Sequence, residues 1–124
     1  MTPPTNITLS KNKKLLTVSF KETNFSMSSE YLRVYSPSAE VRGHGPGQET
    51  LQLNKQDVTI NSIVPMGNYA IAIHFNDGHT TGIYSWSYLN HLGTNKAELW
   101  KDYCNRVDNH HSKNNNQNYH EVSI

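Results

Sequence analysis

The chain has 124 residues, a formal net charge of +1 and 17% charged residues. That length fits a single domain, and the near-neutral charge is unlike the basic surface of a general nucleic-acid-binding protein. The sequence contains no run of 18 apolar residues, and its N-terminus lacks the basic-then-apolar order of a secretion signal. We therefore expect a cytoplasmic protein with neither a membrane nor a nucleic acid as its partner.

A single cysteine, Cys104, excludes an intrachain disulfide and any multi-cysteine metal site within one chain. Residues 108–124 contain five asparagines and almost nothing that could enter an apolar core. Such a segment buries too little apolar surface to offset chain entropy. We therefore predict one folded domain over residues 1–107, followed by a disordered polar tail over 108–124.

Alternating apolar residues predict strands over most of the folded part. Short strands are expected around residues 7–9 and 15–20, and Phe25 and Met27 end a third extended piece. Period-2 alternation continues over residues 57–64 and 69–75, and a further strand is expected at 80–84. Because the turns are short, this pattern predicts an antiparallel meander of about five to six strands.

Helical spacing appears in three places. Ser28 is a candidate N-cap for a short helix at residues 31–35, which Pro37 ends. Ser85 is expected to cap a second helix at 86–92, with Gly93 as its C-cap. A third helix is expected from Asn95, with apolar residues on one face at positions 99, 100, 103, 104 and 107. The predicted fold is a small α+β domain with two to three helices packed on one face of the sheet.

Two segments carry a family resemblance. Residues 31–45 contain Leu32-Arg33 followed by Ser36, Ser38 and Val41, and residues 74–89 contain Asp77-Gly78-His79, then Tyr84 and a tryptophan-containing helix. Together, over roughly residues 14–107, they resemble the gamma-butyrobetaine hydroxylase-like N-terminal domain family. In the oxygenases that carry this domain, three cysteines and a histidine bind a structural zinc ion.

The resemblance places the three cysteine positions on Ser36, Ser38 and Val41, and the histidine position on His79. A structural zinc site needs four donors, typically thiolate or imidazole. A serine hydroxyl stays protonated near neutral pH, and valine offers no donor. We therefore expect a degenerate zinc site and no cofactor, with His79 instead hydrogen-bonded to backbone, Ser36 or Ser38.

Several alternatives involve the glycine-rich loop at residues 40–48. Glu40, His44 and His79 could form a rearranged metal site, which would make this a residual metal-binding domain. Arg33 and Arg42 flank the loop, and residues 42–47 could cradle a small anion or a phosphate-containing ligand. The predicted interaction or ligand surface comprises five residues: Arg33, Arg42, His44, His79 and Tyr84.

No arrangement of residues in the sequence indicates a catalytic site, and a chain this short lacks the oxygenase barrel that would perform chemistry. We therefore expect a protein that is not an enzyme. The resemblance implies an accessory or protein-interaction domain, because other family members are joined to P-loop iron–sulfur carrier proteins. A protein partner in iron–sulfur or related metal-cofactor metabolism is the corresponding expectation.

Overall fold

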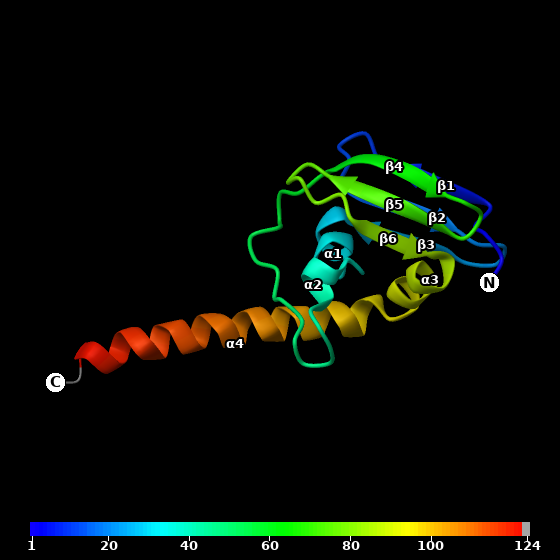
Figure 1. The fold of residues 1–124 in the computed structure, drawn as a ribbon. Coiled ribbons are helices and arrows are strands. Elements are labelled where there is room, and N and C mark those ends of the chain that lie inside the picture. Colours follow the sequence, from blue (N-terminus) through cyan, green and yellow to red (C-terminus); the bar gives the residue numbers. More distant parts are fainter. Residues whose placement is uncertain (123–124) are drawn as a thin grey trace.

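The computed structural model describes residues 1–122, with side chains described through Lys113. Six strands and four helices follow one another along the chain (Figure 1). Their bounds are β1 Asn6–Leu9, β2 Leu15–Ser19, β3 Asn24–Ser28, α1 Ser29–Val34, α2 Ala39–Arg42, β4 Ile60–Met66, β5 Ala70–Phe75, β6 Gly82–Ser85, α3 Trp86–Thr94 and α4 Lys96–Val122.

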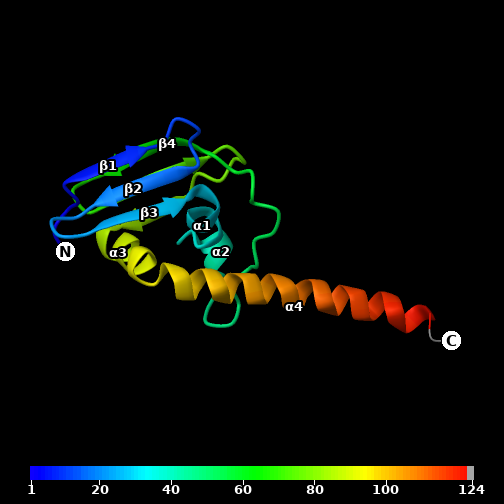
Figure 2. The ribbon, with the colours of Figure 1, turned by 180° about the vertical axis from the view of Figure 1, so that it is seen from behind.

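The first three strands form one antiparallel sheet in the order β1-β2-β3, which lies in front in Figure 2. The β1–β2 turn places Lys13 at a φ of 61°, and the Asn12 side chain accepts a hydrogen bond from the Lys14 amide at 3.1 Å. Leu16 and Val18 point to the same face of β2 and are fully buried. The predicted strands in this part of the sequence are therefore present.

The last three strands form a second antiparallel sheet in the order β4-β5-β6. The central strand β5 places Ile71, Ile73 and Phe75 on one face, and all three are buried. Asn76 connects the following turn to the residue before β4, because its side-chain oxygen accepts a hydrogen bond from the Thr59 amide at 3.0 Å.

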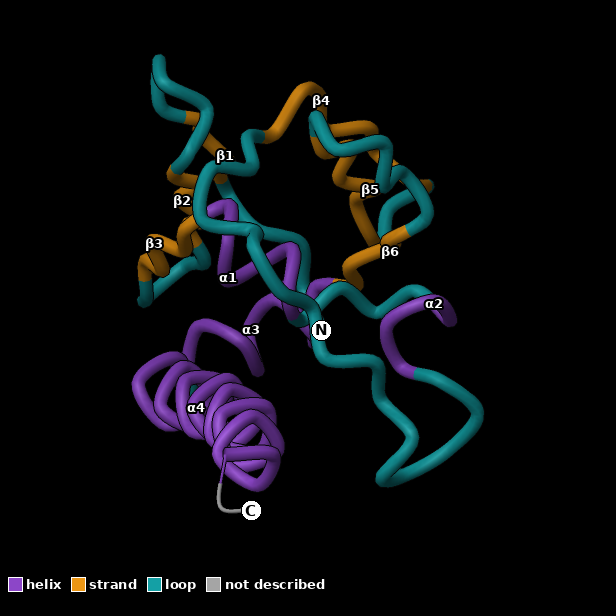
Figure 3. Tube along the Cα trace, turned by 90° about the vertical axis from the view of Figure 1, so that its left-hand side faces the viewer, coloured by secondary structure: helices purple, strands orange, loops and turns teal. Residues whose placement is uncertain are grey.

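The six expected strands are present, but they form two three-stranded sheets, and no single meander forms. The long segment between β3 and β4 contains α1 and α2, so these two strands do not pair as a hairpin. Figure 3 shows the two sheets on opposite sides of the molecule, with α1 between them. Leu16 and Met27 of the first sheet join Ile73 of the second in one core cluster. Alternation predicts which face of a strand is buried, but it does not specify which strands pair.

Helix α1 connects the two sheets. Ser28 is its N-cap, as predicted, and its hydroxyl accepts a hydrogen bond from the Tyr31 amide at 3.0 Å. Tyr31 is buried, and its hydroxyl donates to the Leu92 carbonyl of α3 at 2.6 Å. A buried tyrosine needs such a partner for its hydroxyl, so this bond sets the position of α1 relative to α3.

Helix α3 continues past Gly93, which is therefore not the C-cap that the sequence predicted. Asn95 follows the helix as its C-cap. A Cβ atom at position 93 would lie 2.3 Å from Cγ of Phe25. Glycine is thus required here by the close approach of a neighbouring ring, and not by the end of the helix.

The final helix departs from the sequence-based prediction. α4 continues to Val122, whereas a disordered tail was predicted from residue 108. Residues 108–122 contain neither proline nor glycine to stop a helix that is already nucleated by its packed first turns. Figure 1 shows this polar extension running away from the sheets. The predicted boundary at residue 107 therefore falls inside an element, and residues 123–124 lie outside the described part of the chain.

Within the described residues, no helix is both long enough and apolar enough to cross a membrane.

We predict that Gly93→Ala destabilises the protein by about 1–3 kcal/mol, as overpacked sites typically do. Helix propensity alone would favour alanine by about 1 kcal/mol, so the sign of the change identifies the clash with Phe25. Chemical denaturation measures the free energy of unfolding. The same Gly93→Ala change should cost less in a Phe25→Leu background, and an equal cost in both backgrounds would contradict this account.

Candidate functional site

Two of the residues predicted to replace the zinc ligands, Ser36 and Ser38, contact the ring of His79. Ser36 follows α1, and its hydroxyl lies 2.7 Å from His79 Nε2. The Ser38 hydroxyl lies 3.3 Å from the same nitrogen. His79 belongs to the turn between β5 and β6, so these contacts join the α1–α2 segment to the second sheet. The predicted hydrogen bonding between His79 and Ser36 or Ser38 is therefore present.

Glu40 occupies the other side of the ring. Its Oε2 lies 3.4 Å from His79 Nδ1, and its Oε1 accepts a hydrogen bond from the Thr81 hydroxyl at 3.1 Å. This arrangement favours a proton on Nδ1, with Nε2 accepting from a serine hydroxyl. Burial lowers the pKa of His79 and the Arg33 charge lowers it further, although Glu40 and Asp77 oppose them. The environment of His79 therefore favours the neutral form of its ring.

The donor set does not fit the zinc ion that the family resemblance implies. Val41 lies in α2 and is buried, and it supplies no metal-binding atom. Among the described residues, no group of three or more histidine, cysteine, aspartate or glutamate side chains is placed to hold a metal. Glu40 and His79 are brought together, whereas His44 lies in the wall of a pocket and in no ion pair with either of them. Hydrogen bonds thus occupy the position where relatives are expected to bind metal.

The order Ser36–His79–Glu40 has the connectivity of a serine hydrolase triad, which sequence spacing did not indicate. Ser36 is only 1% exposed, and its hydroxyl oxygen also accepts a hydrogen bond from the Ser38 amide at 3.4 Å. A Cβ at Gly82 would lie 2.6 Å from Ser36 Oγ, so the second sheet closes directly over the hydroxyl. A nucleophile needs room for a carbonyl group, whereas this hydroxyl is nearly enclosed and is held by His79 and the Ser38 amide. The geometry is that of a structural cluster.

Arg33 and Tyr84 do not belong to an exposed ligand surface, which corrects the predicted set. Arg33 is 7% exposed, and its Nε donates to Asp77 Oδ2 at 2.9 Å. Tyr84 is fully buried and donates its hydroxyl to the Leu32 carbonyl. Arg33 lies in α1 and Tyr84 in β6, and the packing of these two elements turns both side chains inward.

Asp77 forms ion pairs with both Arg33 and Lys55. Lys55 Nζ lies 2.8 Å from the same Asp77 oxygen, and the His79 amide donates to Oδ1 at 3.2 Å. Burial raises the pKa of Asp77, but the hydrogen bonds from Lys55, the His79 amide and Arg33 outweigh it and lower that pKa to about 2. Asp77 therefore links the loop before β4 to the His79 turn through an ionised carboxylate.

The remaining predicted surface residues, Arg42 and His44, line a pocket of about 650 Å³. We call it the α4 pocket, because α1, α2 and residues 43–52 form it together with α4. Its lining residues are Val34, Tyr35, Ser36, Val41, Arg42, Gly43, His44, Gly45, Pro46, Glu49, Thr50, Leu51, Gln52, Tyr88, Asp102, Tyr103 and Arg106. Sequence reasoning missed the contribution of α4, since its apolar stripe indicated only core packing.

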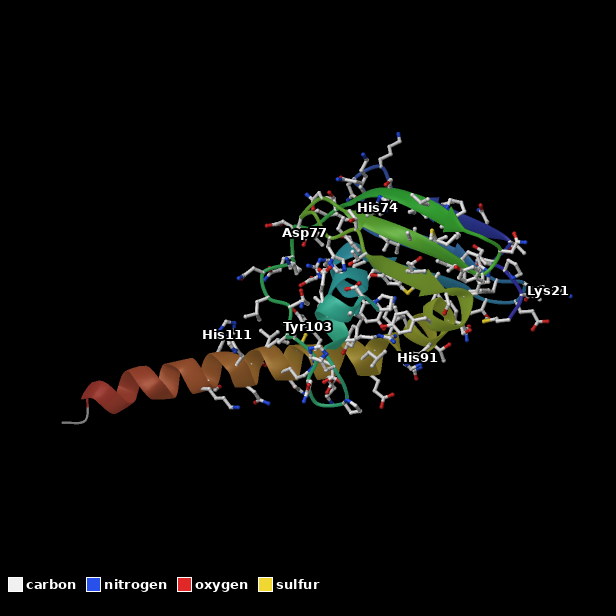
Figure 4. The ribbon with its side chains drawn as sticks, viewed as in Figure 1. Lys21, His74, Asp77, His91, Tyr103 and His111 are labelled. Atoms are coloured by element: carbon white, nitrogen blue, oxygen red, sulfur yellow. The ribbon has the colours of Figure 1, made fainter. Side chains whose placement is uncertain are left out.

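Tyrosine rings hold the cationic groups of the α4 pocket. The Arg42 guanidinium lies over the Tyr88 ring at 5.1 Å, and that of Arg106 lies over the Tyr35 ring at 5.8 Å. In Figure 4, Tyr103 on α4 and Asp77 lie toward one end of the domain, and Lys21 lies at the other. Tyr103 of the α4 pocket and the Asp77 ion pairs therefore lie toward the same end of the domain, the end from which α4 projects.

Comparison with known proteins establishes the family. The model of the gamma-butyrobetaine hydroxylase-like, N-terminal family matches residues 7–90, and the chain belongs to this family. Two NMR solution structures, each covering 87% of this chain, are similar to it at 44% and 42% identity. They have TM-scores of 0.74 and 0.76, and the match covers 81% and 86% of their own chains.

A crystal structure from Acidithiobacillus ferrooxidans is also similar, at 31% identity and a TM-score of 0.61. The match covers 73% of this chain and 91% of that protein, which is described as a member of the DUF971 family with unknown function. None of the curated proteins matches this chain. The comparisons thus show the family and the fold, and no activity accompanies them.

We predict that cysteines at the three degenerate positions restore metal binding. A Ser36→Cys, Ser38→Cys, Val41→Cys variant would offer three thiolates and the His79 imidazole, the donor set of a structural zinc site. Elemental analysis should find one zinc ion per chain in this variant, and adding His79→Ala should lower the zinc content. A folded triple variant with no more zinc than the wild type would contradict the assignment of these positions.

The low pKa of Asp77 predicts a pH-dependent contribution to stability. Because the folded-state pKa of about 2 lies below the unfolded value, the stabilisation is present above the unfolded pKa and is lost as pH falls toward 2. Asp77→Asn should therefore destabilise the protein at neutral pH, and its difference from the wild type should shrink in acid. Urea denaturation across this range measures both, and Asp108→Asn serves as an exposed control. A difference independent of pH would contradict the role given to the Asp77 charge.

Proposed function

We propose that this protein is a non-catalytic accessory domain that binds a protein partner through residues 42–52 and the adjoining face of α4. The observation that carries the proposal is the α4 pocket, whose wall is built by the longest stretch of the chain without a helix or strand, residues 43–59. Long irregular loops on a rigid scaffold are a common location for binding residues.

The anchoring of this loop supports a binding role. The Thr50 amide donates to the Val41 carbonyl at 2.9 Å, and the Tyr103 hydroxyl donates to the Gln52 carbonyl. The loop is therefore fixed at Val41 and again near α4, while Arg42 and His44 between these points are exposed. A surface held in this way loses little conformational freedom when a partner binds.

The enclosed serine beside His79 favours binding over catalysis. Ser36 is only 1% exposed, and its hydrogen bond with His79 holds the segment that leads into α2. By family resemblance, we further propose that the partner acts in iron–sulfur or related metal-cofactor metabolism. The protein would then contribute a recognition surface, and its partner would supply the cofactor chemistry.

Affinity capture with variants tests the proposal. The tagged full chain is expected to recover the same partner from native lysate as a Lys21→Ala control, whose substitution lies at the far end of the domain (Figure 4). An Arg42→Ala, His44→Ala variant should recover at least about fivefold less, since a central interface residue typically contributes more than about 1 kcal/mol.

Mass spectrometry identifies the recovered protein, and binding to the purified partner must show the same ranking of variants. The absence of any reproducible partner, or equal recovery by both variants, would overturn the docking surface. A partner unrelated to metal cofactors would retain the surface and reject the proposed metabolic link.

A further inference from the structure

The chemistry of the α4 pocket points to a particular class of ligand. Its volume of about 650 Å³ lies within the roughly 300–1,000 Å³ typical of small-molecule and cofactor sites. Two arginines and two acidic residues line it, together with tyrosine rings and aliphatic side chains. These groups differ in whether their hydrogen-bonding capacity is already used, and that difference determines what the pocket can bind.

Arg42 carries the available positive charge. Its guanidinium is held over the Tyr88 ring, and none of the ion pairs among the described residues includes it. Contact with the Tyr88 ring and hydroxyl restricts the side chain, and the remaining N–H groups of the guanidinium are available to a carboxylate. Arg42 is therefore oriented before a ligand arrives.

Arg106 is already engaged by its neighbours. Its Nε forms an ion pair with Asp102 Oδ2 at 3.2 Å, although this buried nitrogen makes no hydrogen bond with any described residue, and its Nη2 donates to the Tyr35 hydroxyl at 3.2 Å. Asp102 thus compensates the charge of Arg106, and Glu49 adds a second negative charge to the lining. The four charged side chains of the lining thus sum to zero. The two carboxylates therefore repel a phosphate dianion more strongly than a ligand with a single negative charge, which can pair with Arg42.

The pocket tyrosines present rings and not hydroxyls. Tyr35, Tyr88 and Tyr103 each donate to a backbone carbonyl, those of Leu99, Tyr35 and Gln52 respectively. Their hydroxyls are thus committed to the protein itself, and the rings join an aliphatic wall formed by Val34, Val41 and Leu51. Such a lining favours an apolar or aromatic ligand body.

We propose that the α4 pocket binds a monocarboxylate with an apolar or aromatic body, whose carboxylate pairs with Arg42. The inference rests on the proposed function, because it names the ligand chemistry of the same surface. The carboxylate can belong to a free small acid or to the C-terminal residue of the partner, since both present the same group.

Titration of the isotope-labelled full chain with 3-phenylpropionate, followed by NMR, tests the inference. Millimolar ligand should shift the amide signals of residues 42–52 and of the α4 turn around Tyr103. Arg42→Gln should weaken binding about tenfold, as expected for loss of a charge-assisted pair. Lys101→Gln, which removes an exposed charge on the same helix, should leave binding unchanged, and 3-phenylpropanamide, which lacks the charge, should not bind.

Each other result overturns the inference. These results are no shifts at millimolar 3-phenylpropionate, shifts confined to another part of the domain, equal affinity in the folded Arg42→Gln variant, or tighter binding of phenyl phosphate than of 3-phenylpropionate. The amide spectrum of each variant verifies that it is folded.

A second pair of probes distinguishes the two sources of the carboxylate. An acetylated peptide that ends in phenylalanine with a free C-terminus should bind more tightly than 3-phenylpropionate if a partner supplies the group, and its amidated form should not bind. If the peptide with a free C-terminus binds no more tightly than 3-phenylpropionate, the natural source of the carboxylate is a free small acid. If no carboxylate binds, the ligand inference is overturned, but a partner recovered from lysate still supports the docking surface. If no partner is recovered, the docking surface is overturned, but the titration still tests the ligand. The two proposals therefore fail separately.

Discussion

The hydrogen bonds around the His79 ring are the constraint on which the arrangement of the site depends. One ring nitrogen meets Ser36 and Ser38 from the segment after α1, and the other faces Glu40 at the start of α2. A single side chain in the β5–β6 turn thereby fixes the region that leads into residues 43–52. In a buried environment these bonds satisfy polar groups that would otherwise be costly to leave unpaired. The positions to which the family resemblance assigns a metal ion therefore form a hydrogen-bonded junction in this protein.

Tyrosine hydroxyls extend this junction across the helices. Five tyrosines donate to backbone carbonyls in other segments: Tyr31 to Leu92, Tyr35 to Leu99, Tyr84 to Leu32, Tyr88 to Tyr35 and Tyr103 to Gln52. Each ring adds apolar area to a small domain while its hydroxyl stays paired. These bonds hold α1, α3, α4 and residues 43–52 together. The α4 pocket lies where that network meets the exposed loop, so a rigid framework surrounds the groups available for binding.

The sequence-based predictions succeeded where the signal is local. Alternation placed the strands of both sheets, and Ser28 and Ser85 cap their helices through the amides of Tyr31 and Tyr88. The missing cysteines also identified Ser36, Ser38 and His79 as neighbours, because the family motif encodes their proximity. The predictions failed where distance along the chain is large. No local sequence feature distinguishes one six-stranded sheet from two sheets that share a core. Gly93 has the residue type of a helix C-cap, but the close approach of the Phe25 ring is the reason that glycine stands there.

Residue type and spacing alone determined the family, the strands and helices, and the absence of the thiolate ligands. Those properties depend on neighbours within a few positions or on a motif preserved in order. Only the tertiary structure decided which charged residues remain available to a ligand. Arg33 and Arg42 flank the same loop in the sequence, yet one is buried against Asp77 and the other lies over Tyr88 at the pocket wall. Burial and pairing arise from segments distant along the chain, so they are properties of the packed molecule and not of the local sequence.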